Sequence, residues 1–135
     1  MAKRILIVDD HPPTLALIRA VLEAEKYQDL SIREAGTGTD ALKTFDRAGP
    51  FDLVLLDVGL PDLDGFTVCR ALRKVDAHVP IVFITAKGEL KDFATGREAG
   101  GDSYLVKPIS RAALRNTVNL FLNVQRAAEQ TAKGS

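Results

Sequence analysis

Three aspartates, one threonine and one lysine each stand at the end of a short apolar run in this sequence: Asp9, Asp10, Asp57, Thr85 and Lys107. Carboxylates that converge repel one another, and the pKa of at least one should rise unless a cation neutralises the group. Mg²⁺ suits such a group, because it prefers a few carboxylates together with water and phosphate oxygens. A carboxylate held beside Mg²⁺ and an ammonium can attack phosphorus and form an acyl phosphate. These residue types therefore predict phosphoryl-transfer chemistry.

Short apolar runs alternate with amphipathic stretches along the chain. Continuous runs are typical of strands buried on both faces of a parallel sheet, and there are three: Ile5–Val8, Leu53–Leu56 and Ile81–Ile84. Leu30–Arg33 alternates like a half-exposed edge strand, and Tyr104–Val106 is a short fifth candidate. The intervening stretches have helical spacing or helix-starting residues. We expect helices from Pro12, over Gly38–Arg47, Phe66–Lys74 and Leu90–Glu98, and from an N-cap at Ser110 to about Arg126.

Five strand–helix pairs in strict alternation predict an α/β fold, a doubly wound parallel sheet covered by helices. Ligands bind such a sheet outside the carboxyl ends of its strands, which is where the five polar residues fall. Any one of them alone is ordinary, since an aspartate after a strand is commonly a turn former or a helix cap. The prediction of a site depends on their joint placement at one edge.

Composition excludes several classes of protein. The 135 residues have room for one domain, and 18 basic residues balance 18 acidic ones. This balance argues against direct nucleic-acid binding through a basic surface. The single cysteine, Cys69, excludes an internal disulfide and a Cys-rich zinc site. Because no run approaches the roughly 20 apolar residues of a membrane span, we expect a cytoplasmic protein without membrane insertion.

Four segments, in this order and spacing, resemble the receiver domain of two-component response regulators, the CheY-like family. They are Ile7–Asp10, Asp57–Gly65, Ile84–Ala86 and Tyr104–Pro108. The resemblance covers residues 3–124 and leaves residues 125–135 as a C-terminal tail or a truncated linker. It implies a flavodoxin-like (βα)5 fold whose five-stranded parallel sheet has the order 2-1-3-4-5.

The resemblance also implies a phosphoacceptor and a metal site. By this match Asp57 receives the phosphoryl group. Asp9, Asp10 and Asp57 bind Mg²⁺ together with the backbone carbonyl of Gly59. Gly59 departs from the family pattern, which commonly has a larger residue there. The resemblance therefore does not predict how well the phosphoryl group is shielded.

Further roles implied by the resemblance fall on the later strands. Thr85, the Ala86 N–H and Lys107 would stabilise the phosphoryl oxygens. Thr85 and Tyr104 match the family's switch residues, and Pro108 is expected to follow a cis peptide bond. A long cation, Lys87, stands two residues after Thr85, where the family tunes phosphoryl lifetime.

The function implied is a signalling switch of a His–Asp phosphorelay, with no separate enzymatic substrate. A sensor histidine kinase or histidine phosphotransfer protein would supply the phosphoryl group. The signal would leave through the face of the fourth helix, fifth strand and fifth helix, to a downstream protein or by self-association. On the fifth helix, one stripe predicts a core face: Leu114, Val118, Phe121 and Leu122. An adjacent stripe is either more core or a partner surface: Ala113, Thr117, Leu120 and Val124.

Three other functions are less compatible with the sequence. A non-phosphorylated receiver that acts as a protein-binding module would normally lack one of the site residues, whereas all are present here. A flavin-binding domain needs an anion-cradling loop after the first strand, but residues 9–13 are acidic and poor in donors. An aspartyl phosphatase would show Asp-x-Asp-x-Thr at that position, and the sequence does not.

Overall fold

The computed structural model describes residues 3–25, 29–86 and 90–134; side chains are described up to residue 122, those of residues 90–92 excepted. Five parallel strands form one sheet in the order β2-β1-β3-β4-β5. The strands are β1 (Lys3–Val8), β2 (Leu30–Ala35), β3 (Leu53–Asp57), β4 (Ile81–Thr85) and β5 (Ser103–Val106). The helices are α1 (Pro12–Ala24), α2 (Gly38–Ala48), α3 (Gly65–Val75), α4 (Leu90–Ala99) and α5 (Arg111–Gly134). The predicted doubly wound, flavodoxin-like fold is confirmed.

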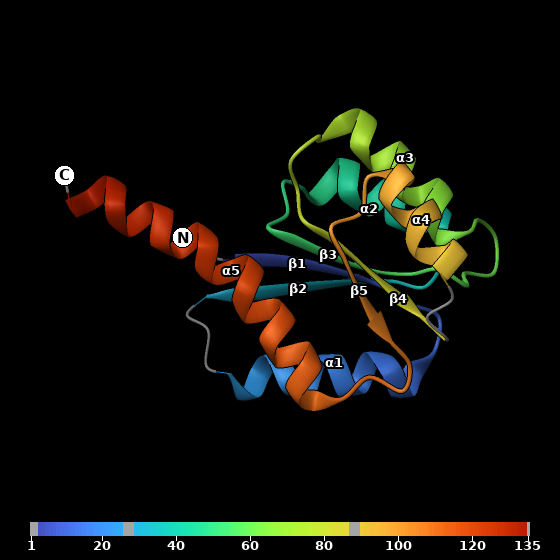
Figure 1. Cartoon of the computed structure of the whole chain (residues 1–135), viewed down its shortest axis with the longest axis horizontal. Coiled ribbons are helices and arrows are strands. Elements are labelled where there is room, and N and C mark those ends of the chain that lie inside the picture. The colour runs from blue at the N-terminus through green and yellow to red at the C-terminus, as the bar shows by residue number, and fades with distance from the viewer. Residues whose placement is uncertain (1–2, 26–28, 87–89, 135) are drawn as a thin grey trace.

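Helices cover both faces of the sheet. Figure 1 shows α1 and α5 on one face and α2, α3 and α4 on the other. Alternate residues of β1 serve the two faces, as the period of a strand requires. Ile5 and Ile7 lie in the core beneath α1 and α5, whereas Leu6 and Val8 lie in the core beneath α2 and α3. This double burial explains the continuous apolar runs of the central strands.

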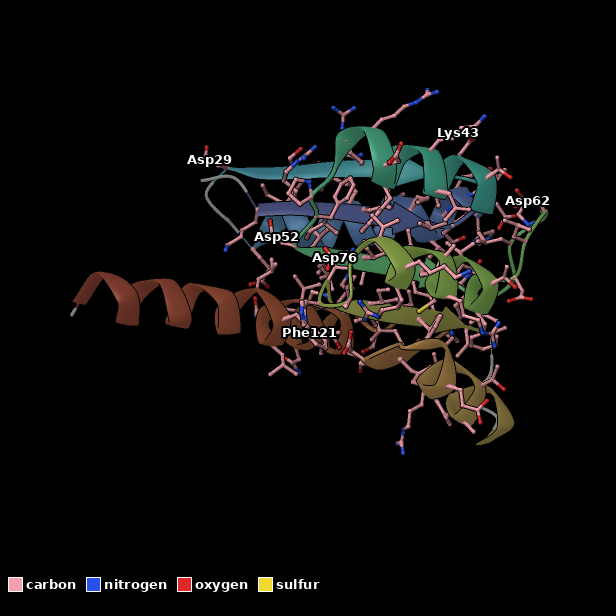
Figure 2. All side chains as sticks on the ribbon, turned by 90° about the horizontal axis from the view of Figure 1, so that it is seen from above. Asp29, Lys43, Asp52, Asp62, Asp76 and Phe121 are labelled. Atoms are coloured by element: carbon pink, nitrogen blue, oxygen red, sulfur yellow. The ribbon has the colours of Figure 1, made fainter. Side chains whose placement is uncertain are left out.

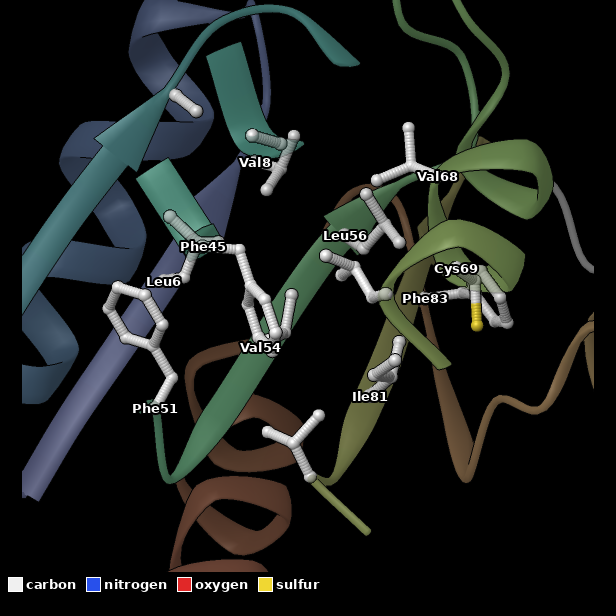
Figure 3. Close-up of a cluster of buried hydrophobic side chains, with 14 of the residues drawn as sticks. Leu6, Val8, Phe45, Phe51, Val54, Leu56, Val68, Cys69, Ile81 and Phe83 are labelled. Carbon is white, nitrogen blue, oxygen red and sulfur yellow. The ribbon is translucent and has the colours of Figure 1, made fainter. Parts of the chain in front are cut away.

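The core beneath α2 and α3 contains the larger aromatic cluster (Figure 3). Phe83 of β4 is fully buried, with its ring centroid 5.1 Å from that of Phe66 and 5.5 Å from that of Tyr104. Burial of a side chain of this size contributes about 1.5–3 kcal/mol. These contacts tie α3 and β5 to the strand that ends at Thr85.

Local signals in the sequence located the helix starts correctly. Pro12 and Pro13 begin α1, and the Ser110 hydroxyl accepts a hydrogen bond from the Ala113 N–H at 2.9 Å, as an N-cap does. Predicted boundaries elsewhere differ by one or two residues from those observed. No helix in the described part of the chain combines the length and the apolar run that crossing a bilayer demands.

The C-terminal helix is longer than predicted. We expected α5 to end near Arg126 and residues 127–135 to fray, but α5 continues to Gly134 and extends past the sheet (Figure 1). Ala, Glu, Gln and Lys make up most of residues 127–133, and these are strong helix formers. The polar character that suggested a frayed end is therefore compatible with a helix.

Candidate functional site

The strand register brings the predicted site residues to one edge of the sheet. Val8 pairs with Leu56, and Asp57 pairs with Ile84. Thr85, the next residue of β4, pairs with Val106. Each strand therefore ends at the same level, and the residues that follow converge from four separate segments.

Three carboxylates meet at this edge. One oxygen from each of Asp9, Asp10 and Asp57 can be chosen so that all three lie within 4.8 Å of one another. Asp9 is fully buried and Asp57 nearly so, whereas Asp10 is exposed. Asp9 Oδ1 accepts a hydrogen bond from the backbone N–H of His11 at 2.8 Å, which fixes the orientation of the carboxylate.

The lysine that follows β5 lies against two of these acids. Lys107 Nζ is 3.1 Å from Asp9 Oδ2 and 3.4 Å from Asp57 Oδ2. The other Asp57 oxygen, Oδ1, accepts a hydrogen bond from the Gly59 N–H at 3.1 Å. The two oxygens of Asp57 therefore have different environments, one facing the β3–α3 loop and one facing the ammonium.

These contacts shift two pKa values. Burial raises the pKa of Asp57, and the nearby Asp9 carboxylate adds to the rise, although the Gly59 N–H and Lys107 oppose it. The direction agrees with the expected rise of one carboxyl pKa, and burial comes ahead of charge repulsion as its cause. Burial acts to lower the pKa of Lys107, but Asp9 and Asp57 outweigh burial and leave that pKa raised.

The acid cluster has the donor set that a hard divalent cation takes. Asp9 Oδ2 is buried and, among the described residues, has the Lys107 ion pair but no hydrogen bond of good geometry. A buried carboxylate oxygen in that state is poorly satisfied by protein groups alone. Because three carboxylates converge and one retains free acceptor capacity, the residues fit Mg²⁺.

Thr85 and Ala86 lie beside this cluster at the end of β4. Thr85 is buried, and its carbonyl accepts a hydrogen bond from the Lys107 N–H at 2.7 Å. Ala86 is exposed. The predicted influence of Lys87 concerns a residue outside the described part of the chain.

Tyr104 lies between the sheet and α4. Its hydroxyl donates to the Phe93 carbonyl at 2.6 Å, and its ring centroid is 4.5 Å from that of Phe93. Gly96 of α4 makes room for this arrangement, because a Cβ there would overlap the Tyr104 hydroxyl. The Tyr104 side chain is thus held against α4 by a hydrogen bond to the backbone of that helix.

The Lys107–Pro108 peptide bond is cis, as the resemblance implies. A second cis bond, Gly49–Pro50, was not predicted. Both residue pairs are visible in the sequence, but only Lys107–Pro108 belongs to a family motif that implies a cis bond. Nothing in the sequence distinguishes Gly49–Pro50 from a trans pair.

Comparison with known proteins settles the family. A family profile of the response regulator receiver domain matches residues 5–119. The chain belongs to this family. Receiver domains of solved structure superpose on it over nearly their full length. The CheY-like receiver domain protein from Methanospirillum hungatei has a TM-score of 0.84, with 28% sequence identity over 95% of this chain and 99% of that one. The BeF3-activated DrrB receiver domain of Thermotoga maritima has a TM-score of 0.80, with 30% identity over 91% and 99%.

Curated relatives are longer than this receiver chain. The DNA-binding response regulator MtrA of Mycolicibacterium smegmatis is 40% identical over 99% of this chain and 58% of its own length. This receiver chain spans about half the length of the curated relatives it matches first.

One contact next to the acid cluster could not be predicted from the sequence. Asp62, in the loop between β3 and α3, accepts hydrogen bonds from the N–H groups of Gly38 and Thr39 at the start of α2. Its partners stand more than twenty positions earlier in the chain, and an aspartate in a loop carries no signal of such a contact. Only the tertiary arrangement identifies it.

Proposed function

We propose that this receiver accepts a phosphoryl group on Asp57 and changes conformation in response. The observation that carries the proposal is the placement of the Asp57 carboxylate between Lys107 and the Gly59 N–H, inside a cluster of three acids. The donor would be a phosphohistidine of a sensor histidine kinase or a histidine phosphotransfer protein. The chain would act as a signalling switch that supports its own phosphorylation and dephosphorylation, without a separate substrate.

The transfer step is an in-line displacement at phosphorus. An oxygen of ionised Asp57 forms the new O–P bond, while the P–N bond of the donor breaks and its electron pair returns to the imidazole, which takes up a proton. Lys107, beside Asp57 Oδ2, would stabilise negative charge on the phosphoryl oxygens. The Thr85 hydroxyl and the Ala86 N–H would complete the set of donors.

Asp9, Asp10, Asp57 and the Gly59 carbonyl would hold Mg²⁺. When bound, this ion supplies positive charge that reduces the repulsion between the acids and the incoming phosphoryl group. Together with Lys107 it would balance the three carboxylates.

Labelling by acetyl phosphate tests the proposal. Wild-type protein and Asp57→Asn are incubated with acetyl phosphate, with and without Mg²⁺, and read by intact mass. We expect one labile phosphoryl group that requires both Mg²⁺ and Asp57. Binding of beryllofluoride, which does not hydrolyse as an acyl phosphate does, reports a short-lived product. A folded protein that takes neither label nor beryllofluoride would refute the proposal and favour the alternative, a non-phosphorylated binding module.

The face of α4, β5 and α5 is the proposed output surface. Two of its large apolar side chains are exposed: Val106 of β5 at 44% and Leu120 of α5 at 60%. In the core stripe of α5, Leu114, Val118 and Leu122 are buried as expected, and Phe121 is partly buried against the same core. In the second stripe Ala113 and Leu120 are exposed instead, and the side chain of Val124 lies outside the described residues. Ala113 and Leu120 are therefore available to a downstream protein or to a second copy.

Sedimentation velocity with and without beryllofluoride tests self-association through this face. We expect the sedimentation coefficient to rise with beryllofluoride in wild type and not in Leu120→Ser. The output proposal is wrong if beryllofluoride changes neither the sedimentation coefficient of wild type nor the amount of partner protein recovered in a pull-down.

The extent of the unit and its other partners are also proposals. We assign the receiver to residues 3–124 and residues 125–135 to a tail or truncated linker. The balanced charge of the chain favours no direct nucleic-acid binding by these residues, although the longer relative MtrA is named a DNA-binding regulator. Fluorescence anisotropy with duplex DNA at 0.15 M salt would check this, and specific binding would contradict it.

A further inference from the structure

The loop between β3 and α3 (residues 58–64) is joined to the start of α2 as well as to its own strand and helix. Asp62 makes the junction. Its Oδ1 accepts the Gly38 N–H at 2.7 Å, and its Oδ2 accepts the Thr39 N–H at 2.9 Å and the Thr39 hydroxyl at 2.6 Å. In Figure 2, Asp62 lies at the end of the molecule away from Asp29 and Asp52, which precede β2 and β3. It is therefore on the side of the predicted site.

The first turn of α2 is short of acceptors without Asp62. The first N–H groups of a helix have no partner within it, and they attract negative charge. The N-cap residue Thr37 satisfies only the Asp40 N–H, at 3.0 Å. Asp62 satisfies the two that precede it. The Thr39 hydroxyl, with the Thr39 and Gly38 amides, holds the pKa of Asp62 well below its usual range.

A second contact at the same junction is independent of these hydrogen bonds. A Cβ on Gly38 would lie 2.8 Å from Leu63 Cβ and 2.9 Å from Val68 Cγ2. The loop and α2 thus approach each other so closely that only glycine fits at position 38. Polar and apolar contacts together fix the middle of the loop against α2.

The loop carries Gly59, whose N–H donates to Asp57 Oδ1. We infer that Asp62 is a positioning residue for the cation site: by fixing the loop on α2, it holds Gly59 against Asp57 in the geometry that binds Mg²⁺. This inference rests on the proposed function, because the Gly59 carbonyl is the proposed metal ligand. The Asp62 side chain has its hydrogen bonds with Gly38 and Thr39, and none of them goes to a proposed metal ligand.

Asp64 offers a matched control in the same loop. It is also an exposed aspartate that caps a helix, accepting the Thr67 N–H at 2.8 Å, but it caps the helix to which the loop leads. Asp62→Ala and Asp64→Ala remove the same charge near the site. Only Asp62→Ala releases the loop from α2.

The experiment is a calorimetric titration of the whole chain with Mg²⁺ at 0.15 M salt, for wild type, Asp62→Ala, Asp62→Asn and Asp64→Ala. Loss of a group that orients a metal ligand costs about 10–100-fold in affinity, and an effect passed through the backbone should be about 3–10-fold. We expect Asp62→Ala to lose about 3–10-fold in Mg²⁺ affinity, and Asp62→Asn, which keeps one acceptor, to lose less. The Mg²⁺ affinity of Asp64→Ala should change within about twofold. Exchange of the Gly59 amide, followed by NMR without Mg²⁺, should be faster in Asp62→Ala alone.

The outcomes separate this inference from the proposed function. If wild type binds Mg²⁺ and Asp62→Ala loses no more affinity than Asp64→Ala, the positioning role is wrong and the proposed function stands. If wild type binds no Mg²⁺, both are wrong. Unfolding by urea accompanies each variant. Should Asp62→Ala not fold, Asp62→Asn and Gly38→Ala provide the same comparison, because each disturbs the junction by a different contact.

Discussion

The Lys107 ammonium lies closer to Asp9 than to Asp57, with Nζ 3.1 Å from Asp9 Oδ2 and 3.4 Å from Asp57 Oδ2. Asp9 is the more deeply buried of the two acids. In this state the lysine serves first as the counter-charge of a buried carboxylate, and the proposed phosphoacceptor shares it. An added phosphoryl group on Asp57 would compete with Asp9 for the same ammonium.

Lys107→Met should therefore destabilise the protein. It leaves Asp9 and Asp57 buried without a counter-charge, which we expect to lower the free energy of unfolding by about 1–3 kcal/mol at pH 7. Urea unfolding of the Mg²⁺-free protein measures this. Lys43→Met, an exposed lysine of α2 (Figure 2), is the control and should change little. Equal effects of the two substitutions would show that the Lys107 ion pairs contribute nothing.

Asp57→Asn should have the opposite effect. It removes a buried charge whose pKa is raised by burial and by Asp9, so the Mg²⁺-free protein should gain about 1 kcal/mol in unfolding free energy at pH 7. Added Mg²⁺ should stabilise wild type more than Asp57→Asn and narrow the gap, because binding to the folded state adds to its stability. The exposed Asp46→Asn serves as a control for the loss of one charge. A loss of stability in Asp57→Asn would contradict this account of the site.

The pH dependence of stability follows from the same shift. Because the folded-state pKa of Asp57 is raised above its ordinary 3.8, the folded state binds more protons between these two values. The free energy of unfolding contributed by this group therefore falls as pH rises from 3.8 through the raised pKa, and is constant above it. The stability difference between Asp57→Asn and wild type should grow over that window and then level off. Urea unfolding at a series of pH values measures this difference. A difference independent of pH would be evidence against a raised pKa of Asp57.

Lys107 has the reverse sign at the alkaline end. Its pKa is raised above the ordinary 10.5, so its stabilisation is fully present below 10.5 and is lost as pH rises through the folded-state value. The deficit of Lys107→Met relative to wild type should thus shrink in that range. Circular dichroism of urea unfolding at pH 9 and above would follow it. A deficit that stays constant there would mean that Lys107 stabilises the fold by packing and not by charge.

Gly96→Ala should displace Tyr104. A glycine inside a helix costs about 1 kcal/mol relative to alanine, and here the space is occupied by the Tyr104 hydroxyl. We expect a loss of about 1–3 kcal/mol from overpacking, with changed NMR shifts of the Tyr104 ring. Gly36→Ala is the control, because a Cβ there meets nothing within 4 Å. An unshifted Tyr104 ring in Gly96→Ala would show that α4 does not hold the tyrosine.

The strands and the edge at which the acids meet could be predicted because buried strands consist of apolar residues, which are recognisable in the sequence. Leu53–Leu56 and Ile81–Ile84 are buried on both faces, so their continuous apolar runs are unambiguous. The residues after them then had to meet, since all parallel strands end at the same edge. Only the family resemblance assigned roles to Gly59 and Tyr104.

Other features depend on contacts between distant segments or on energies that compete locally. Asp62 is recognisable as an anchor only when α2 is placed beside its loop. The space for Tyr104 in α4 likewise comes from Gly96, which the sequence presents as a poor helix former. The predicted end of α5 comes too early because polar residues suggest fraying, whereas residues 127–133 favour the helix by propensity.

The strand order also determines when, during synthesis, the Lys107 ammonium can join the three carboxylates. Of the five strands of the sheet, β5 is synthesised last, and it occupies an edge of the sheet next to β4. Lys107 follows it directly. A nascent chain that stops before β5 carries Asp9, Asp10 and Asp57 without the ammonium that balances them. Under the proposed function, the three acids therefore gain their balancing charge only when the fifth strand is added, so a chain without β5 would lack the proposed phosphoryl-transfer site.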